Sequence, residues 1–145
     1  MKQKLEIKDL SPYFPYGIKA TLSSIGRLNL DSEYPNEHAN KIGVVDEWFV
    51  NDNEIGGVLR VGQNYSFDFQ EIDEIDIHLR PLAWIQNEIT HEGHSFIPSL
   101  TLKLSYPGEM IGLNPATWSY RVIQKLLEWH FDVFGLISKD MAVSY

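Results

Sequence analysis

The sequence predicts an α+β protein in which a small, strongly bent antiparallel β-sheet, partly barrel-like, packs against one long C-terminal amphipathic helix. Three observations predict this class. Residues 42–62 contain two β-branched runs around a turn, residues 65–69 alternate in polarity, and residues 114–134 carry apolar side chains at helical spacing. With 145 residues and no internal repeat or linker, the chain is predicted to form one domain, 1–145.

The N-terminal segment combines turn signals with one strand pattern. Residues 10–19 hold two prolines and a glycine among three aromatic rings, which predicts a turn-rich lead-in with one short helical turn after Ser11. Residues 18–22 then alternate apolar and polar side chains, the pattern of a half-buried strand. Residues 31–41 are rich in Pro, Asn and charge, so we expect a surface loop there.

The strongest β signal is a hairpin. Two β-branched runs, 42–50 and 54–62, are joined by Asn-Asp-Asn, whose residues tolerate the positive φ of a tight turn. The pair Gly56 and Gly57 lies inside the second run. Glycines weaken a strand interior, so they predict a bulge or a close approach of the backbone to another group.

Two further β segments are separated by a helical turn. The run 64–82 is strand-like, with Tyr65, Phe67 and Phe69 on one side, and Pro81 ends it or restricts it to an edge. A short helical turn is expected around the following tryptophan. A small hairpin is then predicted over 88–98, with glycine at its bend.

The C-terminal segment carries helix signals. Residues 100–114 fit a strand or a helix equally well. For the segment that follows, Asn114 is a suitable N-cap, Pro115 is suitable in the first helical turn, and Gly135 is suitable at the helix end. An amphipathic helix of about five turns is therefore predicted over 114–134. Its apolar stripe comprises Trp118, Val122, Leu126, Trp129 and Val133.

Composition excludes several classes of function. The absence of cysteine excludes disulfides, zinc knuckles, iron–sulfur sites and thiol catalysis, and no sequence pattern indicates a cofactor. The formal net charge of -8 disfavours direct nucleic-acid binding and permits docking on a basic protein surface. Without a long apolar run or a signal peptide pattern, the protein is expected to be soluble, away from membranes and cytoplasmic.

One candidate cluster lies near the C-terminus. Glu128, His130 and Asp132 alternate between aromatic residues. On a helix His130 lies about 200° from Glu128, so the three side chains are expected not to converge. His130 is therefore predicted to be a structural histidine that packs its ring and hydrogen-bonds a carbonyl, with the helix dipole favouring its charged form.

A second candidate is a metal site in the 88–98 hairpin. His91 and His94 flank the bend and could both reach one divalent ion, with Asp76 or His78 considered as a third ligand. A polar turn is the alternative interpretation, and we favour it. No glycine-rich phosphate loop or serine nucleophile elbow is present in the sequence.

The third candidate is an acidic cluster. It lacks the ligand spacing of a calcium loop, so the two interpretations are a solvated acidic rim and a docking patch for a basic protein. The cluster consists of Asp68, Glu71, Asp73, Glu74 and Asp76.

Three segments resemble small uncharacterised proteins of phages and prophages of Bacteroidetes. They are "LSPYFPYGIKATL" (10–22), "HLRPLAWIQNEITHEGHSFIP" (78–98) and "YRVIQKLLEWHFDVFGLISKDMAV" (120–143). The resemblance implies an origin in a mobile element of a bacterial host. It implies no activity, cofactor or catalytic residue.

These observations lead to one main hypothesis and two alternatives. We expect a non-enzymatic accessory protein that binds a host or phage protein through its acidic surface, and an anti-defence inhibitor such as an anti-CRISPR protein is its sharpest form. The first alternative is a metal-dependent hydrolase using His91 and His94. The second is a small-ligand-binding module whose pocket is lined by Tyr13, Phe14, Tyr16 and Trp84.

Overall fold

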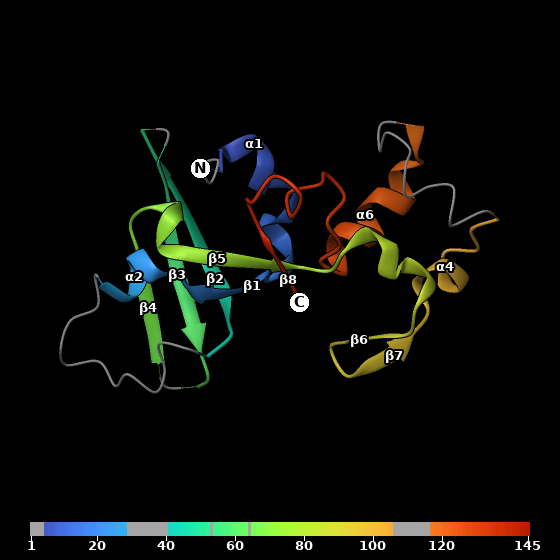
Figure 1. Cartoon of the computed structure of the whole chain (residues 1–145), viewed down its shortest axis with the longest axis horizontal. Helices are drawn as coiled ribbons and strands as arrows, with labels where there is room; N and C mark the ends of the chain where they lie inside the picture. Colours follow the sequence, from blue (N-terminus) through green and yellow to red (C-terminus); the bar gives the residue numbers. More distant parts are fainter. Residues whose placement is uncertain (1–4, 29–40, 53, 64, 106–116) are drawn as a thin grey trace.

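The structure, a computed structural model, describes residues 5–28, 41–52, 54–63, 65–105 and 117–145. These ranges form a six-stranded sheet, a separate hairpin and short helices, so the predicted α+β class is confirmed (Figure 1). The strands of the sheet are β1 (Lys19–Leu22), β2 (Gly43–Asn51), β3 (Glu54–Val61), β4 (Tyr65–Phe69), β5 (Ile75–Leu79) and β8 (Val143–Ser144).

The strand order is β4-β3-β2-β1-β5-β8, and neighbours are antiparallel except β5 and β8, which are parallel. The edge strands β4 and β8 do not pair with each other. The sheet is therefore not closed, and the barrel-like part of the prediction is wrong. The strand-like run 64–82 is two strands, because the 3₁₀ turn η2 (Ile72–Glu74) carries the chain from β4 to the far side of β1.

The predicted hairpin is confirmed in β2 and β3. Its strands pair up to Asn51 and Glu54, and Asp52 in the turn adopts a left-handed φ of 49°. The register shifts between Val45 and Glu47, which places a bulge in β2.

The expected close backbone approach occurs at both glycines of β3. An added Cβ at Gly56 would lie 2.7 Å from the Phe69 carbonyl oxygen. At Gly57 it would lie 2.2 Å from the Glu47 carbonyl oxygen and 2.8 Å from the Phe69 ring. Gly57 pairs with Trp48 on one side and Phe69 on the other, so its missing side chain lets these two rings meet edge to face.

Replacing Gly57 with alanine should lower the free energy of unfolding by about 2–3 kcal/mol, since backbone must move to admit the methyl group. Denaturant unfolding measures the change. Gly62→Ala is the matched control: its Cβ meets nothing within 4 Å, so only its left-handed φ of 72° is penalised, by about 1 kcal/mol. Equal losses in the two variants would contradict the close-approach explanation.

The N-terminal lead-in is turn-rich, as predicted. A short helix α1 (Ile7–Leu10) continues into the 3₁₀ helix η1 (Ser11–Tyr16), and Gly17 ends it with a φ of 54°. The predicted strand is confirmed in β1, which is followed by the helix α2 (Ser24–Leu28). The loop predicted over 31–41 lies outside the described residues except for its last one.

The prediction of a long C-terminal helix is wrong. The observed helix α6 (Tyr120–Glu128) has nine residues and begins after Ser119, whose side chain accepts a hydrogen bond from the Val122 amide. The proposed N-cap Asn114 and Pro115 lie outside the described residues.

The end of α6 explains the shorter helix. The His130 amide donates to the Leu127 carbonyl and the Phe131 amide to the Leu126 carbonyl. This is a Schellman motif, and His130 takes its left-handed position with a φ of 62° where glycine is usual. The next residues leave the helix because Phe131 forms a bridge with Arg80 beside β5.

The second hairpin lies at the other end of the molecule from β2 and β3, and the chain runs toward it from β5 (Figure 1). After β5 come the expected helical turn, η3 (Leu82–Gln86), and the predicted hairpin. Its strands are β6 (Ile89–His91) and β7 (His94–Phe96). The first two residues of the undecided segment, 100–114, are the end of the helix α4 (Pro98–Thr101), and its residues 106–114 are not described.

Buried side chains of the sheet, η1, α6 and the C-terminal segment form one hydrophobic core. Tyr13 of η1 is fully buried, and its hydroxyl donates to the Phe131 carbonyl over 2.7 Å. This contact fixes the start of the chain against the segment that follows α6. In the described ranges, no helix has the length and apolar character needed to cross a membrane.

Candidate functional site

The five residues of the acidic cluster are spread over β4, η2 and β5. Asp68 on β4 and Glu71 and Asp73 around η2 are exposed. Glu74 and Asp76 are half-buried, and both have interactions within the protein. The Glu74 carboxylate accepts the amides of residues 70 and 71, so it stabilises the turn. Three of the five carboxylates therefore face solvent.

The structure adds two acidic residues that the sequence analysis missed. Asp52 and Glu54 lie at the β2–β3 turn, and with Glu71 they line a hollow of about 450 Å³. Phe49 and Phe69 line the same hollow, and Phe49 is 53% exposed. The sequence signal for this region is the aromatic residue Phe49, three positions before the acidic residues of the turn. We call this region, Phe49 with Asp52, Glu54, Asp68, Glu71 and Asp73, the acidic surface.

The two hairpin histidines have different surroundings. His91 and His94 are register partners, but the His91 side chain is 10% exposed whereas His94 is exposed. His78, considered as a third ligand, lies 3.0 Å from the Thr21 hydroxyl. Across the described ranges, no three His, Asp or Glu side chains are grouped so that they could hold a metal ion.

Arg80, which the sequence analysis did not select, is the centre of a buried polar network. It follows β5 and is 3% exposed. Its Nη1 donates to the Trp129 carbonyl and, over 3.2 Å, to Nδ1 of His91. Its Nη2 donates to the Thr90 carbonyl over 2.8 Å. The guanidinium carbon lies 4.3 Å from the centre of the Tyr145 ring. In the described part of the chain no carboxylate pairs with Arg80.

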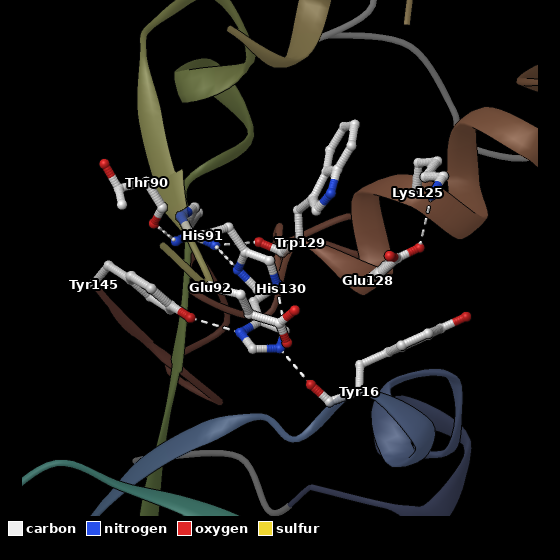
Figure 2. A network of polar contacts seen from close by, with 10 residues as sticks. Tyr16, Thr90, His91, Glu92, Lys125, Glu128, Trp129, His130 and Tyr145 are labelled. Carbon is white, nitrogen blue, oxygen red and sulfur yellow. Dashed lines mark hydrogen bonds and ion pairs between the residues drawn. The ribbon is translucent and has the colours of Figure 1, made fainter. Parts of the chain in front are cut away.

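His130 is the second buried group of this network. Figure 2 shows its ring between Tyr16 and Tyr145. Nε2 lies 2.5 Å from the Tyr16 carbonyl oxygen, which can only accept, so Nε2 carries the proton. Nδ1 therefore accepts from the Tyr145 hydroxyl over 2.6 Å. The predicted ring packing and carbonyl hydrogen bond are both present.

The charge state expected for His130 has to be corrected. Burial lowers its pKa to about 4, and the nearby His91, Arg80 and Lys19 act in the same direction. The hydrogen bond to Tyr16 opposes this shift without overcoming it. The imidazole is therefore neutral at pH 7, because desolvation outweighs the helix dipole.

His91 is held in a single tautomer. Its Nδ1 accepts from Arg80, which only donates, so its proton is on Nε2. Burial and the charge of Arg80 lower its pKa. The ring contacts that of His130 edge to face, with centroids 4.9 Å apart. Its Nε2 lies 3.9 Å from Oε1 of Glu92.

A cleft of about 780 Å³ opens beside these histidines. One wall is a row across the sheet in which Lys19 pairs with Val44 and Val44 with Arg60, so the three side chains project from one face. The opposite wall is the β6–β7 turn, and the end of η1 and His130 complete the lining.

Of the nine described residues with left-handed backbone, four line this cleft. Glu92 and Gly93, with φ of 50° and 82°, form the hairpin turn, and His130 has a φ of 62°. Gly17, with a φ of 54°, also lines the cleft. Side chains such as Glu and His rarely adopt this conformation, and residues that do so cluster at functional sites.

The candidate triad does not converge, as predicted, although the reason is different. Glu128 pairs with Lys125 over 3.2 Å at the end of α6. The Asp132 carboxylate accepts the amides of Leu136 and Ile137 and so stabilises the turn after α6. The His130 ring is hydrogen-bonded to Tyr145 and Tyr16. Of the three triad residues, Glu128 and His130 line the cleft and Asp132 does not.

Of the aromatic residues expected to line a pocket, Tyr16 alone lines this cleft. Tyr13 is buried in the core, Phe14 stacks on Trp48 with centroids 4.8 Å apart, and Trp84 packs against the core.

Comparison of the chain with protein-family models, curated proteins and solved structures found no match. Three segments that are far apart in the sequence, 10–22, 78–98 and 120–143, meet at one place. They supply Tyr16, Arg80, His91 and His130 to the polar network, and Figure 2 labels Tyr16, His91 and His130.

Proposed function

We propose that the protein is a non-enzymatic binding protein that docks on the basic surface of another protein through its acidic surface. The observation that carries this proposal is the composition of that surface. An exposed aromatic ring, Phe49, lies at a hollow bordered by Asp52, Glu54 and Glu71. Protein interfaces commonly have an aromatic centre and a polar rim, and carboxylates of one sign favour a partner of opposite potential.

The resemblance to phage proteins supports a host or phage protein as the partner. A bacterial defence protein that handles nucleic acid has the required basic surface, so inhibition of such a protein, as by an anti-CRISPR, is the most specific form of the proposal.

Two variants with equal loss of charge test this docking. In the first, Asp68→Asn is combined with Glu71→Gln, which keeps an oxygen acceptor for the η2 capping interaction. In the control, Glu88→Gln is combined with Asp140→Asn at other exposed positions. The tagged proteins are incubated with host lysate at about 0.05 M salt, and retained proteins are identified by mass spectrometry.

We expect one host protein to be retained by the wild type and by the control, and its recovery to fall about tenfold with the first variant. Washing at about 0.3 M salt should also release it, because exposed charges are then largely screened. Equal recovery with both variants would contradict docking through the acidic surface.

The cleft supports a second proposed function, the binding of a small molecule. Its volume of about 780 Å³ is in the range of small-molecule sites, and polar groups from three separate parts of the chain converge on it. The metal-hydrolase alternative has less support, because Nδ1 of His91 already accepts from Arg80.

A further inference from the structure

We propose that the cleft binds an oxyanion, a carboxylate or phosphate group of a small organic molecule, through Nε2 of His91 and the ammonium group of Lys19. This inference rests on the proposed small-molecule function of the cleft and specifies the chemistry of its ligand.

The first argument is the charge around the cleft. Lys19 and Arg60 line one wall, and Arg80 lies directly behind His91. Arg60 pairs with Asp46 over 2.8 Å, but no carboxylate of the described ranges pairs with Lys19 or Arg80. A buried cation without a counter-charge is costly, so the charge of Arg80 favours an anion bound nearby, across the His91 ring.

The second argument is the direction of the available hydrogen bond. Because Arg80 donates to Nδ1 of His91, the ring must present Nε2–H on its other side. That side belongs to the lining of the cleft, where Nε2 faces Glu92. Arg80 thus acts as a positioning residue that makes His91 a fixed donor.

The third argument is the position of Glu92. Its side chain is 84% exposed, and its carboxylate lies 3.9 Å from Nε2 of His91, too far for a hydrogen bond. It therefore approaches the donor without occupying it. The other lining carboxylate, Glu128, is paired with Lys125 on α6. A ligand oxyanion that comes within hydrogen-bonding distance can displace the weakly held Glu92.

The size of the cleft indicates a ligand larger than a simple ion. A volume of about 780 Å³ holds an organic molecule, and Tyr16 is part of the lining. The oxyanion would then orient the ligand, while its remaining surface packs along the sheet wall.

Titration with inorganic phosphate and with citrate tests the proposal, followed by calorimetry and by the NMR signals of the His91 ring. Lys19→Met removes the charge and keeps the aliphatic stem, and Glu92→Gln removes the competing carboxylate. Lys139→Met, at an exposed position outside the cleft lining, removes the same charge and is the matched control.

We expect at least one probe to shift the His91 signals of the wild type. Its affinity should fall about tenfold in Lys19→Met, as is usual for a lost charge-assisted hydrogen bond, rise several-fold in Glu92→Gln, and stay unchanged in Lys139→Met. A response to citrate alone identifies a carboxylate ligand, and a response to phosphate alone a phosphate ligand.

Three results would overturn the proposal. Failure of both probes to move the His91 signals, in the wild type and in Glu92→Gln, excludes an oxyanion site. An equal loss in Lys19→Met and Lys139→Met indicates nonspecific ion attraction. If uncharged nucleosides or sugars shift His91 equally in wild type and Lys19→Met, the small-molecule function stands and the oxyanion chemistry is wrong.

Discussion

Replacing Arg80 with methionine is expected to lower the free energy of unfolding by about 3–5 kcal/mol. Methionine fills much of the space but leaves the carbonyls of Thr90 and Trp129 without the donors that they have now. A buried carbonyl left unsatisfied, as at Trp129, costs about 1–3 kcal/mol. The half-buried carbonyl of Thr90 costs less, and the contact with the Tyr145 ring is also lost. Since small domains are stable by about 5–15 kcal/mol, this variant should be close to unfolding at 37 °C.

Urea unfolding followed by tryptophan fluorescence measures this loss. Arg60→Met is the matched control, because Arg60 forms an ion pair whose two side chains are 50% and 44% exposed and which is worth less than about 1 kcal/mol. Arg80→Lys separates charge from geometry, because an ammonium group keeps the positive charge but cannot reproduce the planar arrangement of guanidinium donors. We expect an intermediate loss of unfolding free energy. A loss below about 1 kcal/mol in Arg80→Met would show that the network contributes little to stability.

The size of this effect follows from what Arg80 connects. Its donors hold the end of β5, the strand β6 and the end of α6 together. The backbone repeats the same connection, since the Arg80 amide donates to the His130 carbonyl and the Asp132 amide to the Arg80 carbonyl. These segments are 10 and 49 residues from Arg80, so one side chain joins parts of the fold that no local pattern relates.

The elements that the sequence predicted well are those determined by local chemistry. The β2–β3 hairpin follows from β-branched runs and a turn, and the close approach at Gly57 follows from glycine in a strand interior. The turn of the small hairpin follows from Gly93 in the same way. None of these predictions requires knowledge of which distant segment packs nearby.

The length of α6 could not be predicted, because local and tertiary signals conflict there. The apolar stripe continues to Val133 in the sequence, and Gly135 suits a helix end. In the fold, Phe131 and Val133 are both buried after the helix has ended. Phe131 forms a bridge with Arg80, and Val133 lies in a turn in which its amide donates to the Phe131 carbonyl. A helical period therefore does not distinguish a buried helix end from a buried nonhelical segment.

The site was predicted in parts but not as a whole. His91 and His130 were both selected from the sequence, yet as members of two unrelated clusters. Their rings touch only because of the connection through Arg80, and an arginine after an alternating strand resembles an ordinary exposed residue. Tyr145, at the end of the sequence, gave no local signal at all.

Acidification is expected to destabilise the protein by about 3 kcal/mol through His130 alone. Its pKa is about 4 in the folded protein, against 6.5 in its unperturbed state. Between about pH 6.5 and pH 4, His130 is protonated in the unfolded chain but stays neutral in the folded protein. The free energy of unfolding therefore falls as the pH is lowered through this range. Each unit of difference between the two pKa values is worth about 1.4 kcal/mol.

The variant His130→Asn isolates this contribution. Asparagine tolerates a left-handed φ better than most residues, and it does not titrate. Burial raises the pKa of Tyr145 to about 12, so its hydroxyl stays a donor throughout this pH range and can bond to the amide oxygen. Other groups, including His78 and His91, whose pKa values are also lowered by burial, remain in both proteins and cancel in the comparison.

Urea unfolding of both proteins at pH 7.5 and pH 4.5 gives the result. The wild type should lose about 2–3 kcal/mol more than His130→Asn between these pH values. His94→Asn, which removes an exposed histidine from the same region, is the matched control, and the full wild-type loss should persist in it. Parallel losses in the wild type and His130→Asn would mean that His130 is protonated in the folded state, and its hydrogen bond from Tyr145 would then have to be reassigned.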